Sequence, residues 1–170
     1  MASKRAYDRE RHAHFVTFSC YRRRRLLDND RVKRVVLGVL NSQLTLQDGR
    51  CVGFVVMPDH VHAVVWLPGH DQIVHFMKQL KNRTYVNMQR LLASIFVKYA
   101  KPIDPSEPVW QAGYYDLNLL IKGKAEEKLV YMHQNPVRAG LVVKPCDWPW
   151  SSARLYESGQ TVGVPVGWLD

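Results

Sequence analysis

The N-terminal part of the chain carries two hydrophobic patterns, one typical of a strand and one typical of a helix. Residues 14–20 alternate apolar and polar positions and are rich in β-forming types, which predicts a strand. From Val32 onward the apolar residues recur at the spacing of an amphipathic helix, and Asn29 or Asp30 can cap its start. We therefore expect a strand followed by a helix.

Two further strands are predicted in the middle of the chain. A turn at 47–50 leads into an apolar stretch at 52–57, and a break at Pro58 and Asp59 leads into a second stretch at 60–67. Because the break between them is short, we expect the two strands to pair as a hairpin.

The second half of the chain predicts a helix, a strand and a final helix. A long helical stripe of apolar residues follows Asp71, which can cap it. Three prolines at 102–108 predict a loop, and 109–121 has the aromatic and β-branched content of a strand. Residues 125–135 then have helical spacing. The order β-α-β-β-α-β-α is that of an α+β, ferredoxin-like (βαββαβ) antiparallel sheet with an additional C-terminal helix.

Composition indicates one globular domain and bears on its cellular location. The 170 residues are 46% hydrophobic and 23% charged, enough to bury a core without disulfides. No apolar run approaches the roughly 20 residues of a membrane span, and the first ten residues are charged, so a cytoplasmic location without membrane contact is expected. Cys20, Cys51 and Cys146 form no CxxC pair and are expected to be reduced.

A formal charge of +9 makes nucleic acid the first partner to consider. Residues 1–34 hold eleven Lys or Arg against four acids, and residues 72–101 hold six without an acid. Charge runs of this kind are most often solvated surface, but two clusters of one sign in a small chain favour binding. The candidate contacts are Arg22, Arg23, Arg24, Arg25, Lys78, Lys81 and Arg83.

His60 and His62 lie inside one predicted strand. Residues two apart in a strand point to the same face, so both imidazoles would be presented together, as two ligands of one divalent metal require. By spacing alone, such a pair is more often incidental or packed than metal-binding.

Tyr131 and Asn135 are four residues apart on the last predicted helix, which places them on one face, one turn apart. A tyrosine beside an amide that completes a His/His/Asn metal site would form a phosphoryl-transfer centre. The alternative is a packed tyrosine and a helix-terminal asparagine, and Pro136 disfavours a regular helical conformation at Asn135.

Three motifs together resemble those of the REP-associated tyrosine transposases, a branch of the single-tyrosine HUH transposases. They are MPDHVHAVVWLP at 57–68, WQAGYYD at 110–116 and YMHQNPVRAGLV at 131–142. The resemblance extends from about Tyr7 to Tyr156, and the combination is more specific than any single piece.

The resemblance implies a fold, a reaction and a set of roles. The implied fold is the ferredoxin-like HUH nuclease fold, with His60, His62 and Asn135 as ligands of Mg²⁺ or Mn²⁺ and Tyr131 as the nucleophile. The tyrosine of such enzymes attacks single-stranded DNA beside palindromic hairpins (REP elements), leaving a 5′-phosphotyrosine link and a free 3′-OH. This branch is expected to act as a monomer, although related transposases include dimers.

Five nearby residues have alternative roles. Tyr114 and Tyr115 could be nucleophiles, but they lie on a predicted strand with no amide four residues on. His133 should point away from the site by the helical repeat. Glu127 could be a fourth ligand or a surface ion-pair partner, and Asp59 could orient a histidine or belong to a turn.

Two other functions compete with a transposase. One is a non-catalytic single-stranded nucleic-acid-binding module, although paired histidines stand where stacking aromatics would be expected. The other is a zinc hydrolase, but no HExxH helix accompanies the histidines. We predict one HUH domain over residues 1–141 and a tail over 142–170 that packs on it or contacts DNA.

Overall fold

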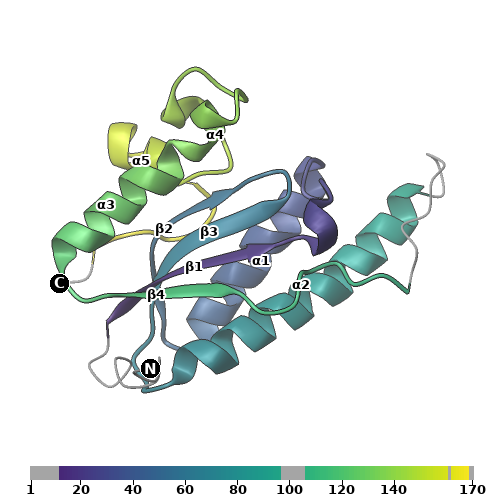
Figure 1. Ribbon diagram of the computed structural model, residues 1–170, viewed down its shortest axis with the longest axis horizontal. Coiled ribbons are helices and arrows are strands. Elements are labelled where there is room, and N and C mark those ends of the chain that lie inside the picture. The colour runs from purple at the N-terminus through teal and green to yellow at the C-terminus, as the bar shows by residue number, and fades with distance from the viewer. Residues whose placement is uncertain (1–11, 97–105, 161, 169–170) are drawn as a thin grey trace.

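The structure is a computed structural model that describes residues 12–96, 106–160 and 162–168. Its centre is a four-stranded antiparallel sheet in the order β2-β3-β1-β4 (Figure 1). The strands are β1 (Ala13–Ser19), β2 (Arg50–Val56), β3 (His60–Trp66) and β4 (Tyr115–Leu119). The helices are η3 (Tyr21–Arg23), α1 (Asp30–Leu46), α2 (Gln72–Phe96), α3 (Lys122–His133), α4 (Asn135–Arg138), η4 (Pro145–Asp147) and α5 (Ala153–Ser158). The ferredoxin-like βαββαβ order is confirmed, and the single additional helix that was expected after it, α3, is followed by three further short helices.

Helices α1 and α2 pack on one face of the sheet (Figure 1). Asn29 caps α1, because its side chain accepts a hydrogen bond from the N–H of Arg31 at 2.9 Å. Leu40 of α1 and Phe76 of α2 are buried in the main hydrophobic cluster beneath them. Among the described residues, no helix is long and apolar enough to cross a membrane.

Helix α3 crosses the opposite face of the sheet, over a second hydrophobic cluster (Figure 1). Leu129 and Met132 of α3 are buried there with Phe15 of β1 and Val55 of β2. The helix approaches β2 so closely that a Cβ on Gly53 would lie 2.3 Å from Leu129 Cδ2 and 2.7 Å from Met132 Cε. Glycine at this position therefore sets how near α3 lies to the sheet.

The C-terminal segment runs along the outer edge of β2. The N–H of Val56 donates to the carbonyl of Trp150 at 2.8 Å, and the N–H of Ser152 donates to the carbonyl of Phe54 at 2.9 Å. These bonds satisfy backbone groups that an uncovered edge strand would leave unpaired.

Two element boundaries differ from the sequence prediction. The strand expected over 109–121 is shorter, because Gly113 adopts a positive φ of 72° and interrupts the extended backbone before β4. The final helix was expected over 125–135, but α3 begins at Lys122 and ends at His133. A separate short helix, α4, then begins at Asn135. Pro136 explains this ending, because it has no N–H to continue the helical ladder.

Candidate active site

Strand β3 presents His60 and His62 on the sheet face that α3 covers. The two imidazole centroids lie 4.7 Å apart, as expected for residues two apart in a strand. The His62 ring is stacked on Phe15 of β1, with centroids 5.3 Å apart and 20° between the planes. The structure thus brings the two predicted ligands together.

Each imidazole is held through its Nδ1 atom. Thr17 lies opposite His62 in the β1–β3 register, and its Oγ1 is 2.6 Å from Nδ1 of that histidine. One carboxylate oxygen of Asp59 lies 2.6 Å from Nδ1 of His60, and the other lies 2.8 Å from Nε of Arg23. When each Nδ1–H donates to its oxygen partner, Nε2 carries the lone pair that can bind a metal.

Burial keeps both rings neutral at neutral pH. It lowers the pKa of His62 to about 3, and positive charge nearby acts in the same direction. Burial also lowers the pKa of His60, although the hydrogen bond with Asp59 opposes this shift. Neutral imidazole is the form that binds metal ions, so the pair is ready to do so without first losing protons.

Tyr131, on the last turns of α3, lies against the same histidine. Its ring centroid is 5.8 Å from that of His62 and 6.2 Å from that of Phe15, both in edge-to-face arrangements. The side chain is 43% exposed, so a substrate can reach it. A strand imidazole and a helix phenol therefore share one surface.

Asn135 lies one turn beyond Tyr131, although α3 ends between them. Gln134 keeps a right-handed helical backbone (φ −79°, ψ −12°), and its N–H donates to the carbonyl of Val130 at 3.1 Å. The side-chain nitrogen of Asn135 is buried without a hydrogen-bond partner among the described residues. A metal would be bound by the amide oxygen of Asn135, so the unpaired nitrogen bears on the donor side of the amide and not on metal binding. The role of Asn135 as third ligand stays a prediction.

The two histidines are the metal donors that the described residues present together at this surface, while the carboxylate of Asp59 is engaged by His60 and Arg23. Among the residues that the structure describes, no group of three or more His, Cys, Asp or Glu side chains could hold a metal ion. Asn135 as a neutral third donor stays a prediction, with substrate and water as the other sources of oxygen ligands. This donor set leaves coordination positions open, as a catalytic metal requires.

Two cations that the sequence analysis did not select, Lys128 and Arg138, flank Tyr131. Nζ of Lys128 lies 5.3 Å from the Tyr131 ring centroid and Cζ of Arg138 lies 4.7 Å from it. The guanidinium of Arg138 also donates to the carbonyl of Tyr131. Their spacing was the available signal, because residues 128, 131, 135 and 138 repeat every three or four positions along one helical face.

The four consecutive arginines at 22–25 are paired within the protein. Arg22 and Arg24 contact Glu107, with closest distances of 3.5 Å and 2.7 Å, and Arg25 contacts Asp28 at 2.7 Å. Only the ion pair of Arg23 reaches the histidine site, through the carboxylate described above.

The backbone at this turn is strained. Arg22 and Arg23 have positive φ values of 54° and 56°, a conformation that costs a non-glycine residue on the order of 1 kcal/mol or more. The strain accompanies the placement of the Arg23 guanidinium, whose Nη1 donates to Oγ of Ser19 at 2.9 Å.

The predicted cluster on α2 lies on the other side of the sheet from Tyr131 (Figure 1). Lys81 has a structural role, because its ammonium donates to the carbonyls of Gln111 and Gly113 at 2.8 Å and 2.6 Å. Lys78 and Arg83 are exposed. Any DNA contact that they make is therefore remote from the histidine pair.

The alternative site residues take different places. Tyr115 is 51% exposed on β4, and its ring is 6.3 Å from that of Phe15, so it borders the site. His133 points away as expected, since its Nε2 lies 2.7 Å from Oγ of Ser152. Glu127 forms an exposed ion pair with a neighbouring lysine rather than a contact with the site.

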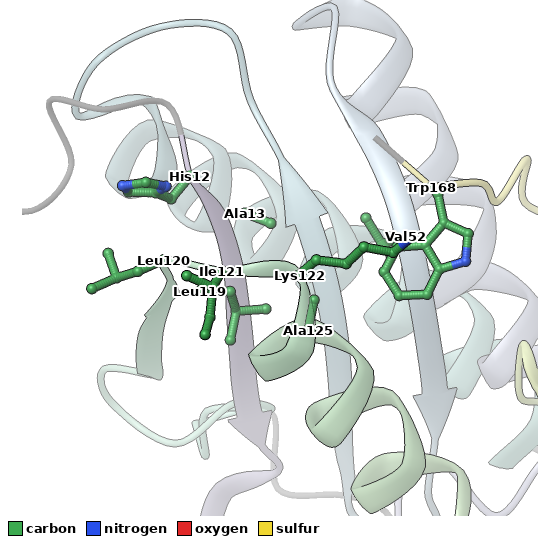
Figure 2. Close-up of a pocket in the computed structure, with 9 residues that line it drawn as sticks. All are labelled: His12, Ala13, Val52, Leu119, Leu120, Ile121, Lys122, Ala125 and Trp168. Carbon is green, nitrogen blue, oxygen red and sulfur yellow. The ribbon is translucent and has the colours of Figure 1, made fainter. Parts of the chain in front are cut away.

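A separate hollow of about 190 Å³ lies near the other end of α3 (Figure 2). Leu119, Ile121 and Ala125 line one part of it, and Lys122 reaches toward the indole of Trp168. Lys122 and Tyr131 are nine residues apart in α3, which is about 13 Å along a helix. This hollow is therefore distinct from the histidine and tyrosine surface.

Comparison with known families identifies the chain. A family model described as "Transposase IS200 like" matches residues 9–130, well over half of the sequence. The chain belongs to this family of IS200-like transposases. The family consists of tyrosine HUH nucleases, and the matched range includes His60 and His62 but ends one residue before Tyr131.

Solved structures show the same fold. A REP-associated tyrosine transposase bound to a REP hairpin superposes with a TM-score of 0.73 at 20% identity, covering 98% of this chain and 92% of that chain. A candidate transposase from Deinococcus radiodurans R1 gives a TM-score of 0.54 at 20% identity, covering 79% of this chain and 98% of that chain. No curated protein matched the sequence. The HUH fold expected from the motifs is thus confirmed.

Proposed function

We propose that this IS200-like transposase is a metal-dependent single-stranded DNA endonuclease and strand transferase that acts beside palindromic hairpins. The observation that carries the proposal is the contact of Tyr131 with His62, with ring centroids 5.8 Å apart. A partly exposed phenol beside a neutral imidazole with an available Nε2 supplies a nucleophile and a metal ligand at one point.

In the proposed reaction the phenol oxygen of Tyr131 attacks a DNA phosphorus atom. The new O–P bond forms as the P–O3′ bond breaks, the phenol proton passes to solvent, and the leaving O3′ takes up a proton. The products are a 5′-phosphotyrosine and a free 3′-OH. Because a phosphodiester replaces a phosphodiester, a DNA 3′-OH can attack the link and join a new strand.

His60, His62 and Asn135 are the residues that would hold Mg²⁺ or Mn²⁺. Two neutral imidazoles that hold a lone pair on Nε2 fit a divalent ion, and the amide oxygen of Asn135 is the atom that would supply a further position. When bound, the ion supplies positive charge that polarises the phosphate. Tyr131 contacts His62 of its own chain, with ring centroids 5.8 Å apart, which supports action as a monomer.

Single-stranded DNA that carries a REP-like hairpin is the proposed substrate. A formal charge of +9 favours a polyanionic partner, and a structural relative was solved with a REP hairpin. The exposed part of Tyr131 lies on the open side of the site, where an unpaired strand can approach.

The test uses hairpin DNA with single-stranded flanks, taken from beside the gene and labelled separately at each end. With Mn²⁺, the protein is expected to form an adduct that survives denaturation and carries the 3′-terminal label, because the tyrosine keeps the 5′-phosphate. Binding without an adduct would favour the alternative, a non-catalytic binding module. An adduct that carries only the 5′-terminal label would contradict the proposed polarity.

A further inference from the structure

Lys128 and Arg138 differ from the other cations near the site in having no acidic partner. Arg23 is paired with Asp59, and Lys124 of α3 is paired with Glu127 at 2.8 Å. In the described parts of the chain, neither Lys128 nor Arg138 has a carboxylate oxygen within ion-pair distance; each instead lies over the Tyr131 ring.

Their positive charge is directed at the metal-binding side of the site. Both cations lie over the Tyr131 ring, whose centroid is 5.8 Å from that of His62, and Nη2 of Arg23 lies 3.5 Å from Nδ1 of His60, so cations from η3, α3 and α4 gather at this surface. Convergence of like charges is unfavourable unless a negative group binds between them. Asp59, the acid that the described residues place at the histidine pair, does not supply that group, because it is already held by His60 and Arg23.

We propose that Lys128 and Arg138 form a phosphate-binding pair that holds the scissile DNA phosphodiester against the hydroxyl of Tyr131. The proposal rests on the function proposed above and adds two residues to its machinery. The expected ligand atoms are the non-bridging phosphate oxygens, which match the fork of a guanidinium. One arm of Arg138 is bonded to the carbonyl of Tyr131, so it is fixed relative to the nucleophile while its other N–H groups can donate to a phosphate.

The charge balance of the site explains why such a pair is needed. The predicted metal donors are neutral groups, so they would hold a divalent ion without adding negative charge to the site. Charge on the phosphate oxygens must be stabilised throughout the attack by the phenol, and preorganised donors do this without moving. Lys128 and Tyr131 lie on α3, and Asn135 and Arg138 lie on α4, which follows it after one residue, so two consecutive helices position the nucleophile, the amide and both cations together.

The first test measures binding without cleavage. EDTA removes divalent metal and so prevents cleavage. The affinity of wild-type protein is measured for two hairpin DNAs, one with a normal scissile phosphate and one with an uncharged methylphosphonate at that position. Wild type should bind the methylphosphonate DNA roughly tenfold more weakly, and its salt slope should fall by about one ion. Lys128→Gln/Arg138→Gln should bind both DNAs alike. Equal discrimination by wild type and the double variant would overturn the proposal.

The matched control is Lys124→Gln, because Lys124 is an exposed lysine on the same helix, one turn before Lys128. It should discriminate between the two DNAs as wild type does. Melting temperatures close to that of wild type will show that each variant is folded, and Arg138→Lys, which keeps the charge, should recover part of the discrimination. Loss of discrimination in the control as well would assign the effect to total charge and overturn the pair.

The second test measures the rate of adduct formation at saturating DNA with Mn²⁺. Arg138→Gln should lower this rate by about 10²–10³-fold, the usual effect of removing a preorganised donor from a transition state. An unchanged rate would overturn the positioning role. If wild type itself forms no adduct, the proposed function fails, but the EDTA binding comparison still decides whether the pair binds a phosphate.

Discussion

Hydrogen bonds at Nδ1 decide which nitrogen of each site histidine can meet a metal. His62 is held by Thr17 and His60 is held by Asp59, each at 2.6 Å. These oxygens fix the ring orientation and favour a lone pair on Nε2. Arg23 holds the carboxylate in turn, so the residue that carries strained backbone also orients a ligand.

Replacing Thr17 with valine tests this arrangement, because Thr17→Val keeps the side-chain shape and removes the oxygen. Affinity for Mn²⁺ should fall about 10- to 100-fold, as is usual when the partner of a ligating histidine is lost. Titration followed by Mn²⁺ electron paramagnetic resonance will measure it. Thr45→Val is the control, since that hydroxyl bonds only a carbonyl of its own helix. Unchanged affinity in Thr17→Val would contradict the role of this hydrogen bond.

His133 should make the fold sensitive to acid. Burial lowers its pKa to about 4, whereas an unfolded histidine titrates near 6.5. Stability from the neutral ring is therefore complete above about pH 6.5 and is lost as the pH falls towards 4, because the unfolded chain takes up the proton first. The loss between pH 7 and pH 5 should be at most roughly 2 kcal/mol. Urea unfolding of wild type and His133→Gln at both pH values will measure it, and an equal loss in the two proteins would contradict the assignment.

At the scale of elements, the position of α3 over the sheet determines whether the tyrosine meets the histidines. Gly53 permits that position, because its missing side chain leaves room for Leu129 and Met132. The helix then holds the Tyr131 ring against His62 and Phe15. The distance between the Tyr131 ring and His62 therefore depends on the absence of a side chain at Gly53.

Gly53→Ala should move α3 and weaken the fold. Its Cβ would meet two flexible side-chain ends at less than 3 Å, and overpacking of this kind costs about 1–3 kcal/mol. The rate of adduct formation should fall as well, because Tyr131 moves with the helix. Gly38→Ala is the control, since nothing lies within 4 Å of a Cβ there, and alanine should stabilise helix α1 by up to about 1 kcal/mol. Thermal unfolding measures both, and equal melting temperatures for the two variants would contradict the packing argument.

Sequence periodicity predicted the order of elements, and local spacing predicted that His60 and His62 share a face of a strand and that Tyr131 and Asn135 lie one turn apart. Their roles as ligands and nucleophile came from the resemblance to a family and not from spacing. The Nδ1 partner of His62 depends instead on β1–β3 register, and the pairing of Arg23 depends on a left-handed turn. Such features arise only when distant segments meet, so no local pattern indicates them.

At the scale of the whole molecule, the basic charge is divided between the two sides of the sheet. Arg22–Arg25 lie next to the histidine side but are engaged in ion pairs. Lys78 and Arg83 are exposed on α2, on the other side. A hairpin that contacts both regions has to extend past the sheet, so the two regions should affect binding and catalysis differently.

Charge reversal on α2 should separate these effects. Lys78→Glu/Arg83→Glu is expected to weaken binding of hairpin DNA about tenfold or more and to reduce the salt slope by about two ions, because two phosphate contacts are lost. The rate at saturating DNA should stay within twofold of wild type, since α2 lies away from Tyr131. Fluorescence anisotropy at several salt concentrations will measure the affinity. Unchanged affinity would show that this face of α2 is only solvated surface.

The central claim is that the hydroxyl of Tyr131 attacks DNA. Tyr131→Phe removes one oxygen and leaves the ring contacts with His62 and Phe15, so it should fold and bind hairpin DNA as wild type does. Tyr115→Phe is the matched variant, an exposed tyrosine on the same side of the sheet that borders the site. The measurement is the yield of covalent protein–DNA adduct with Mn²⁺ and labelled hairpin DNA. The account predicts no adduct for Tyr131→Phe and a wild-type yield for Tyr115→Phe, and the reverse result would contradict it.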